Sequence, residues 1–214
     1  MSYTGNGTDG ATIGHGLTLT APELVIFKNR STAASWATFG YPNNPAFPND
    51  GSVLLLDTTA TMSNSTSKEV SIGSSTITLV DAGGDIGTNG DNYIAYAFHS
   101  VDGYSKVGSY TGNGNADGPF VHCGFRVAYI FFRRTTDVGE HWRVFDNKRS
   151  PYNAVNTALR FNASAAESSA ATYESDFLSN GFKIRTSDID LNANGSTYIF
   201  YAVAESPFKH TNAR

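Results

Sequence analysis

Hydrophobic residues recur along the chain in short runs that are rich in β-branched and aromatic side chains. Runs of this kind, bounded by Gly, Asn, Asp and Pro, predict β-strands and lack the spacing of an amphipathic helix. The predicted strands are Leu24–Lys28, Val53–Asp57, Glu69–Ile72, Thr76–Val80, Asn92–Phe98, Ala128–Arg133, Trp142–Phe145, Ala158–Asn162, Phe182–Arg185 and Thr197–Val203. One stretch, Ala163–Tyr173, has a helix-like composition and predicts a short helix or a turn.

Glycine-containing dipeptides separate the predicted strands. Gly83-Gly84, Asn89-Gly90, Asn180-Gly181 and Asn194-Gly195 are expected to supply the positive φ angles that tight hairpins need. Short strands joined by such turns favour an antiparallel sandwich or a jelly roll.

The whole pattern occurs twice. The six residues SYTGNG at Ser2–Gly7 return unchanged at Ser109–Gly114, and a Trp-x-x-Phe segment begins at both Trp36 and Trp142. Further matches, in the same order, pair Val25–Lys28 with Ile130–Arg133 and Asp85–Phe98 with Asp190–Val203. Preserved order with slightly different spacing is the signature of two copies of one structural unit.

The repeat defines the predicted architecture. We expect an all-β protein made of two tandem antiparallel β-sandwich repeats, of jelly-roll or concanavalin/lectin-like type, packed together. The first domain is predicted at residues 1–104 and the second at residues 105–214. The joint between the repeats is short and contains Tyr104 and Val107, which favours packing between the two domains. Because the first repeat starts directly after Met1, we also expect the chain to be a piece of a longer protein.

Composition excludes several classes of protein. The net charge is −4 and only 16% of the residues are charged, with no basic stripe, so we expect no nucleic-acid partner. No apolar run is long enough to span a bilayer, so we expect no membrane insertion. The single cysteine, Cys123, cannot form an internal disulfide and is predicted to be a small buried residue near a strand.

No catalytic, metal-binding or cofactor-binding residues are predicted. The five histidines are dispersed, and the chain has no nucleophile elbow and no phosphate-binding loop. Aspartates 81, 85 and 91 do not follow the calcium-loop spacing. Carboxylates at 140, 146, 167, 174 and 176 could form a glycosidase pair. However, the first copy has Gly40 where the second has Asp146, so such a pair would exist in only one copy.

The second copy carries the candidate ligand-binding patch. Its Trp segment is surrounded by ionic and aromatic side chains that suit polar or acidic glycans. The candidate residues are Trp142, Arg143, Asp146, Lys148, Arg149 and Tyr152. A tryptophan can stack on a sugar or fill a core, and its presence in both copies favours the core for Trp36 and Trp142.

Several segments of the second copy resemble a repeat found in tail-fibre and related virion proteins of tailed bacteriophages. They are Gly108–Gly114, Asp117–Val121, Arg149–Asn153, Phe177–Arg185 and the ending Ala204–Lys209 through Arg214. The resemblance covers the whole chain and is weaker in the first copy, which has its own Pro-rich loop.

The resemblance implies a lectin-like, non-catalytic module of a distal tail fibre that recognises a host cell-surface glycan. Its expected partners are that glycan, other virion subunits and further copies of itself in a homo-oligomer, with a trimer as one arrangement. The expected location is the tail fibre or outer surface of the virion, after synthesis in the host cytoplasm. The alternatives are a structural virion protein, as a capsid-decorating or fibre-shaft component, and a glycan depolymerase.

Overall fold

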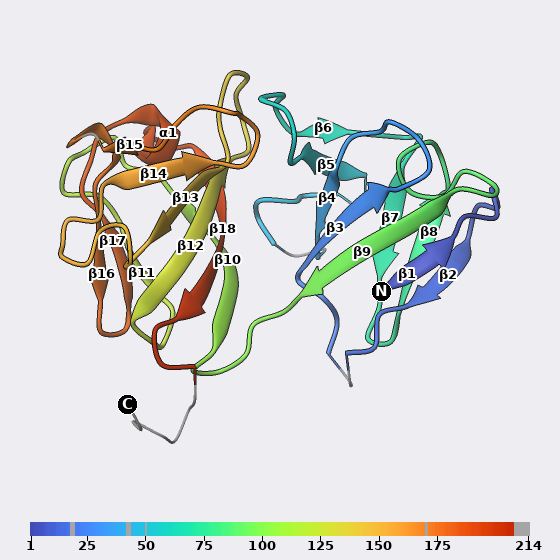
Figure 1. Cartoon of the computed structure of the whole chain (residues 1–214), viewed down its shortest axis with the longest axis horizontal. Helices are drawn as coiled ribbons and strands as arrows, with labels where there is room; N and C mark the ends of the chain where they lie inside the picture. Colours follow the sequence, from blue (N-terminus) through green and yellow to red (C-terminus); the bar gives the residue numbers. More distant parts are fainter. Residues whose placement is uncertain (18–19, 42–43, 50, 170, 208–214) are drawn as a thin grey trace. The chain divides into compact units, whose positions relative to one another are not determined.

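The computed structural model describes residues 1–17, 20–41, 44–49, 51–169 and 171–207 (Figure 1). The chain forms two compact units, Met1–His99 and Ser100–Arg214. Both are built almost entirely from antiparallel strands, which confirms the predicted all-β fold with two repeats. Among the described residues, no helix has the length and apolar character needed to cross a membrane.

The first unit contains a large sheet and a small sheet. Its strands are β1 (Ser2–Thr4), β2 (Ala11–Gly14), β3 (Leu24–Asn29), β4 (Ala37–Gly40), β5 (Ser52–Leu55), β6 (Ser63–Asn64), β7 (Glu69–Ile72), β8 (Thr76–Asp81) and β9 (Asn92–Phe98). The large sheet has the order β1-β9-β3-β4-β5-β6, and the small sheet has the order β2-β8-β7.

The second unit has the same two sheets. Its elements are β10 (Ser105–Thr111), β11 (Phe120–His122), β12 (Val127–Arg134), β13 (Arg143–Asp146), β14 (Thr157–Arg160), β15 (Ser168–Ser169), the 3-10 helix η1 (Ala171–Tyr173), β16 (Ser175–Leu178), β17 (Gly181–Ile184), α1 (Ile189–Asn192) and β18 (Thr197–Ala204). The strand order is β10-β18-β12-β13-β14-β15 in the large sheet and β11-β17-β16 in the small sheet. Each strand of the first unit therefore corresponds to the strand of the second unit whose label is higher by nine, so that β1 corresponds to β10.

Strand register fixes which residues are equivalent. Phe27 lies opposite Ala37 in the first unit, and Phe132 lies opposite Arg143 in the second. Arg143 therefore occupies the position of Ala37, and Trp142 that of Trp36.

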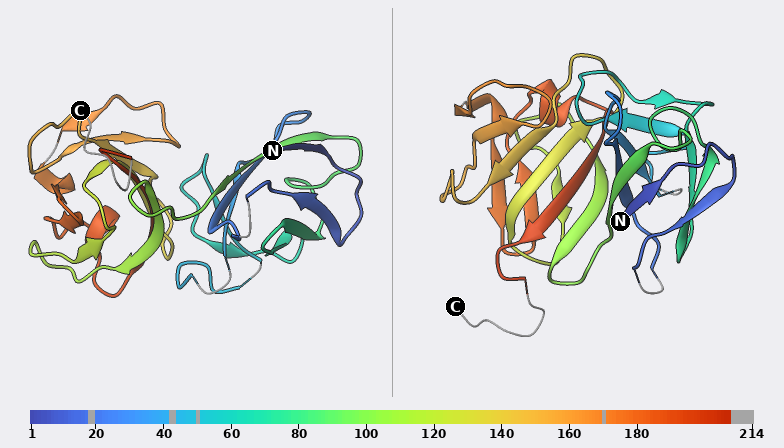
Figure 2. Two further views of the ribbon diagram at one scale, coloured as in Figure 1. Left: turned by 90° about the horizontal axis from the view of Figure 1, so that it is seen from below. Right: turned by 45° about the vertical axis from the view of Figure 1, so that its right-hand side comes forward.

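Each unit buries a core between its two sheets (Figure 2). In the second unit Phe182, from the small sheet, makes edge contacts with Phe132 at 5.2 Å and Phe200 at 5.1 Å between ring centres. All three rings are buried. Because fully burying one such side chain contributes about 1.5–3 kcal/mol, this aromatic contact helps to hold the two sheets of this unit together.

The repeated SYTGNG segment ties the first strand of each unit to the loop before the last strand. Tyr3 stacks on Tyr93 at 5.1 Å and donates a 2.5 Å hydrogen bond to the carbonyl of Ile86. In the second unit, Tyr110 stacks on Tyr198 at 4.9 Å and donates to the carbonyl of Leu191 at 2.8 Å. Within each unit, the SYTGNG segment is therefore in contact with the segment that precedes the last strand.

Glycine is required in this segment for two different reasons. Gly7 and Gly114 adopt φ angles of 65° and 67°, a region that favours glycine. Gly112 has no room for a side chain, because a Cβ there would overlap the carbonyl oxygen of Ala193 and lie 2.9 Å from the carbonyl carbon of Asn192. The first three residues of the segment form β1 in the first unit and the end of β10 in the second.

The turn predictions are correct at Gly90 and Gly195, whose φ angles are 81° and 74°. At Gly181 the expected positive φ is wrong, because this residue begins β17. Glycine is needed there because a Cβ would overlap the carbonyl oxygen of Val121 on the neighbouring strand. Gly83 and Gly84 also lack the expected positive φ.

The prediction of a short helix or a turn within residues 163–173 is correct, because Ala171–Tyr173 forms a 3-10 helix, while Ser168–Ser169 pairs with β14 as an edge strand. The short helix α1 was not predicted. It begins after Asp188, whose side chain accepts a 2.9 Å hydrogen bond from the backbone N–H of Asp190.

Candidate functional site

The predicted patch of the second unit is divided between the two ends of β13. Arg143 begins this strand and Asp146 ends it. Because adjacent strands run antiparallel, the Arg143 end also carries the end of β12 and the loop that contains α1. The Asp146 end carries the start of β14, the end of β11 and the start of β10. We describe these as two separate sites.

Trp142 has no solvent-exposed surface, so it offers no ring face to a sugar in this structure. Its ring contacts Phe131 with 5.8 Å between ring centres. Phe131 alternates along β12 with the core residues Ile130 and Phe132, so Trp142 lies on the opposite face of the sheet from the core. The expectation that Trp142 is a buried core residue is therefore confirmed, and its packing partners lie on the face of the sheet that points away from the aromatic cluster between the sheets.

Trp36 occupies the same position and is only half-buried. It stacks on Tyr96 with 6.4 Å between ring centres, and the Lys28 amine lies 5.7 Å from its ring. Lys28 also donates a 2.5 Å hydrogen bond to the carbonyl of Ala34. In the second unit, Arg133 donates in the same way to the carbonyl of Glu140. A basic side chain from the preceding strand thus holds the loop before each tryptophan.

Arg143 is also buried, with 2% of its surface exposed. Its guanidinium forms an ion pair with Asp190 and donates a 2.9 Å hydrogen bond to the hydroxyl of Tyr173, whose ring lies 4.1 Å away. Asp190 is also hydrogen-bonded to Glu140, which is 5% exposed. These four residues form what we call the Arg143 cluster.

Two carboxyl groups in direct contact cannot easily both be ionised. Burial, together with the hydrogen bond to Asp190, raises the pKa of Glu140 to about 8. Burial acts to raise the pKa of Asp190 too, but the hydrogen bond from Glu140 and the charge of Arg143 hold it below its ordinary value. Glu140 therefore keeps its proton at neutral pH, while Asp190 is the ionised partner of Arg143.

This protonation state predicts a pH dependence of stability. Between about pH 4.5 and pH 8, the folded state keeps a proton on Glu140 that the unfolded chain has released. Stability should therefore fall as the pH rises through this window, by at most about 1.4 kcal/mol per pH unit for one proton. In Glu140→Gln this slope should be lost, as measured by urea denaturation at several pH values. The exposed Glu167→Gln is the control, and an unchanged slope in Glu140→Gln would contradict the assignment.

The sequence analysis did not combine Glu140 with Asp190 and did not consider Asp190 as a site residue. A signal was available in the repeat itself. The first copy has Ala34 and Ala37 where the second has Glu140 and Arg143. Both copies have an aspartate at the third position, which is Asp85 in the first copy and Asp190 in the second.

The other part of the predicted patch lies on the loop between β13 and β14. This loop, residues 147–156, is called the Tyr152 loop below. Asp146 accepts hydrogen bonds from the backbone N–H groups of Lys148 and Arg149, both at 2.9 Å, and from the Arg149 side chain at 2.6 Å. Burial acts to raise the pKa of Asp146, but these hydrogen bonds lower it below its ordinary value. Asp146 is thus an ionised residue that holds the start of the loop.

The far side of the loop is also fixed. Asn153 donates a 3.1 Å hydrogen bond to the carbonyl of Phe177 and accepts one of 2.9 Å from its N–H. Val155 exchanges two backbone hydrogen bonds with Ser175. Between these anchors Tyr152 is 83% exposed. The structure therefore presents an exposed aromatic ring on a well-anchored loop, close in sequence to Lys148 and Arg149.

Cys123 is buried, as predicted, and follows β11 directly. Burial raises the pKa of its thiol to about 12, so the thiolate that a nucleophile requires is not formed near neutral pH. Among the described residues, no group of three or more His, Cys, Asp or Glu side chains is arranged to hold a metal ion.

These features define a tandem β-sandwich protein with two equivalent units, the second of which carries the Arg143 cluster. The sequence matches the family described as "Domain of unknown function (DUF7483)" over residues 1–207, and the chain belongs to this family. The matched region spans the described residues of both units. No curated protein and no solved structure matches the chain significantly.

Proposed function

We propose that this protein is a non-catalytic virion module of a tailed phage that binds a host cell-surface glycan through the Tyr152 loop. The observation that carries the proposal is the 83% exposed ring of Tyr152 on a loop held at both ends by hydrogen bonds. Tyrosine provides a large, rigid contact surface at a low cost in conformational entropy. A loop that is already ordered loses little further entropy when a ligand binds.

The side chains around Tyr152 add polar recognition. Lys148 is exposed and Arg149 is half-buried, and each donates hydrogen bonds that sugar hydroxyls or carboxylates accept. Trp142 and Arg143 no longer belong to this proposed site, because both are buried. The remaining candidates are Asp146, Lys148, Arg149 and Tyr152, with Asp146 in a supporting role.

The geometry of the Arg143 cluster supports a non-catalytic protein. A glycosidase needs two carboxyl groups about 5–9 Å apart, with the sugar between them. Glu140 and Asp190 are instead hydrogen-bonded to each other, and Asp190 is also paired with Arg143. No sugar fits between two carboxyl groups in direct contact, so this pair is better suited to stabilising the fold.

Binding to host cells and to a glycan array tests the proposal, with the protein displayed on beads because many weak sites act together. Tyr152→Ala should weaken binding about tenfold, the equivalent of about 1.4 kcal/mol. Tyr152→Phe keeps the ring and should bind within about threefold of wild type. Val138→Ala is the control, since Val138 is 73% exposed on a loop at the opposite end of the unit.

Three results would overturn the proposal. If the wild-type protein bound neither host cells nor glycans, a structural role in the virion would be favoured. If Tyr152→Ala bound as well as wild type, the glycan site would lie elsewhere. Release of reducing sugar from host glycans would instead indicate a depolymerase.

A further inference from the structure

The outer face of the large sheet in the first unit carries an aromatic pair that lies outside the Tyr152 loop. Lys28 follows the core residue Phe27 along β3, so its side chain points away from the core. Tyr96 follows the core residue Ala95 along β9 and points in the same direction. Trp36 directly precedes β4 and contacts both of them, so the three side chains share one face of the sheet.

The aromatic pair is accessible to solvent. Tyr96 is 43% exposed, and Trp36 is half-buried. The planes of the two rings differ by only 18°, and the ring centres are 6.4 Å apart. Because parallel rings in contact are separated by about 3.5–4 Å, the two rings must be displaced sideways by about 5 Å. Each ring therefore leaves much of the other ring's face uncovered, and together they form a nearly flat aromatic surface.

The second unit fills the equivalent region with rings of its own. Trp142 has no exposed surface and contacts Phe131, which in turn contacts Phe161 with 5.5 Å between ring centres. The N–H of Phe161 donates to the carbonyl of Trp142. In the first unit the N–H of Leu56 donates to the carbonyl of Trp36 in the same way, so Leu56 occupies the position of Phe161. The first unit thus lacks one of the rings that pack together in the second unit.

Hydrogen-bonding groups lie beside the aromatic pair. Asp57 is exposed, and one oxygen of its carboxylate accepts a 3.1 Å hydrogen bond from the backbone N–H of Trp36. Within the described part of the chain this carboxylate has no other partner, so its second oxygen is available to a ligand. Lys28 uses one of its three donors on the carbonyl of Ala34, which leaves two for a ligand.

This combination favours a neutral sugar as the ligand. One face of a sugar ring carries C–H groups that stack on an aromatic ring, while its hydroxyls both donate and accept hydrogen bonds. The carboxylate of Asp57 opposes an anion, and the ammonium group of Lys28 opposes a cation. An apolar protein segment on this surface would leave both charged groups without hydrogen-bond partners, which is unfavourable.

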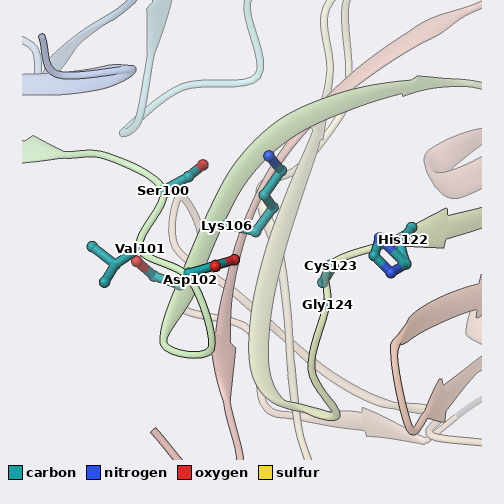
Figure 3. A pocket seen from close by; sticks show the side chains of 8 residues that line it. Ser100, Val101, Asp102, Lys106, His122, Cys123 and Gly124 are labelled. Carbon is teal, nitrogen blue, oxygen red and sulfur yellow. The ribbon is translucent and has the colours of Figure 1, made fainter. Parts of the chain in front are cut away.

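A cavity of about 190 Å³ in the second unit lacks such an aromatic surface (Figure 3). Figure 3 shows Lys106 on one side of the hollow, with His122 and Cys123 on the other. The described residues that line it include no Trp, Tyr or Phe, so a sugar would find none of these rings to stack on. The aromatic face of the first unit is therefore the better sugar site of the two.

We propose that this face of the first unit, which we call the Tyr96 site, binds one neutral sugar ring of the host glycan. Tyr96 and Trp36 provide the stacking surface. Asp57 and Lys28 bind the hydroxyl groups. The inference rests on the proposed function, because it gives the same class of ligand a second point of attachment, separate from the Tyr152 loop.

The test is an NMR titration of the full chain with glucose, galactose, mannose and N-acetylglucosamine, each alone at millimolar concentration. The chain contains two tryptophans, so two indole N–H signals are expected, and Trp36→Phe identifies the signal that belongs to Trp36. At least one sugar should shift this signal. The signal of the fully buried Trp142 should stay in place and serves as an internal reference.

Substitutions locate the sugar on this surface. Tyr96→Ala should weaken the binding of that sugar about tenfold, because the exposed ring is lost. Asp57→Asn keeps an oxygen for the N–H of Trp36 but removes the charge, and should weaken binding about threefold. Val80→Ala is the control, since Val80 is 38% exposed on β8 in the small sheet of the same unit. The amide signals of β3 and β9 check that each variant is folded, and unchanged affinity in folded Tyr96→Ala would overturn the inference.

The outcomes separate this inference from the proposed function. A sugar-induced shift of the Trp36 signal that persists in Tyr152→Ala would support an independent site. If no sugar shifts this signal while host cells are still bound, the Tyr96 site is wrong and the Tyr152 proposal stands. If a sugar binds here and Tyr152→Ala binds host cells as well as wild type, the Tyr152 proposal fails and the Tyr96 site stands. If sodium sulfate shifts the Trp36 signal at a lower concentration than every sugar, the surface is an anion site and the inference is overturned.

Discussion

Replacing Gly112 with alanine is expected to destabilise the second unit by about 3 kcal/mol. A Cβ at this position overlaps the carbonyl oxygen of Ala193, and both groups belong to the backbone. Neither can move without disturbing the hydrogen bonds that Gly112 and Gly195 form with this loop, so the overlap cannot be relieved by a change of rotamer. Guanidinium denaturation followed by amide hydrogen exchange in β10 and β18 would measure the loss.

The duplicated architecture provides an internal replicate and a control. Gly5 occupies the equivalent position in the first unit, where a Cβ would lie 2.7 Å from the carbonyl oxygen of Gly87. Gly5→Ala should therefore destabilise the first unit to a similar extent. Gly14→Ala, on strand β2 with no atom near the added Cβ, should change stability by less than about 0.5 kcal/mol. Equal effects at Gly112 and Gly14 would contradict the steric explanation.

Asp190→Ala is expected to cost about 3 kcal/mol of stability in the second unit. The substitution leaves the guanidinium of Arg143 buried without its ionised partner, and breaking one side of a buried pair costs about 3–5 kcal/mol. The lower end of this range is expected because Glu140, freed from Asp190, can ionise and restore part of the charge balance.

The equivalent residue in the first unit is the matched control for this prediction. Asp85 pairs with Lys68, and the two side chains are 17% and 23% exposed. Because this pair is partly solvated, Asp85→Ala should cost no more than about 1 kcal/mol. Chemical denaturation of both variants near pH 7 would test the difference. A similar loss from both substitutions would mean that the Arg143 cluster has no special role in the second unit.

The comparison of the two units shows how one fold carries different chemistry. The tyrosine pair and the glycine contacts are the same in both, because they hold the sheet edge to the loop before the last strand. The loop between the fourth and fifth strands differs, and so do the residues that face Asp85 and Asp190. The Tyr152 loop and the Arg143 cluster therefore lie where the repeats diverge, on the second unit.

The sequence by itself determined the duplication, the all-β class and the central strands. Thr197–Val203, for example, was predicted within one residue of the observed Thr197–Ala204. These features depend on local patterns, since a strand is recognised from its own alternation of side chains and a duplication from matching letters. Short edge strands such as β6 and β15 were missed because two residues show no periodicity.

The tertiary structure decided which of the predicted site residues reach solvent. Alternation along a strand separates two faces, but only the tertiary structure determines what covers each face; here both Trp142 and Arg143 are buried, whereas the loop residue Tyr152 is exposed. The contact between Glu140 and Asp190 joins residues that are distant in the chain. Glu140 lies in the loop between β12 and β13 and Asp190 lies in α1, so their contact depends on how the fold places these two segments and has no local sequence pattern.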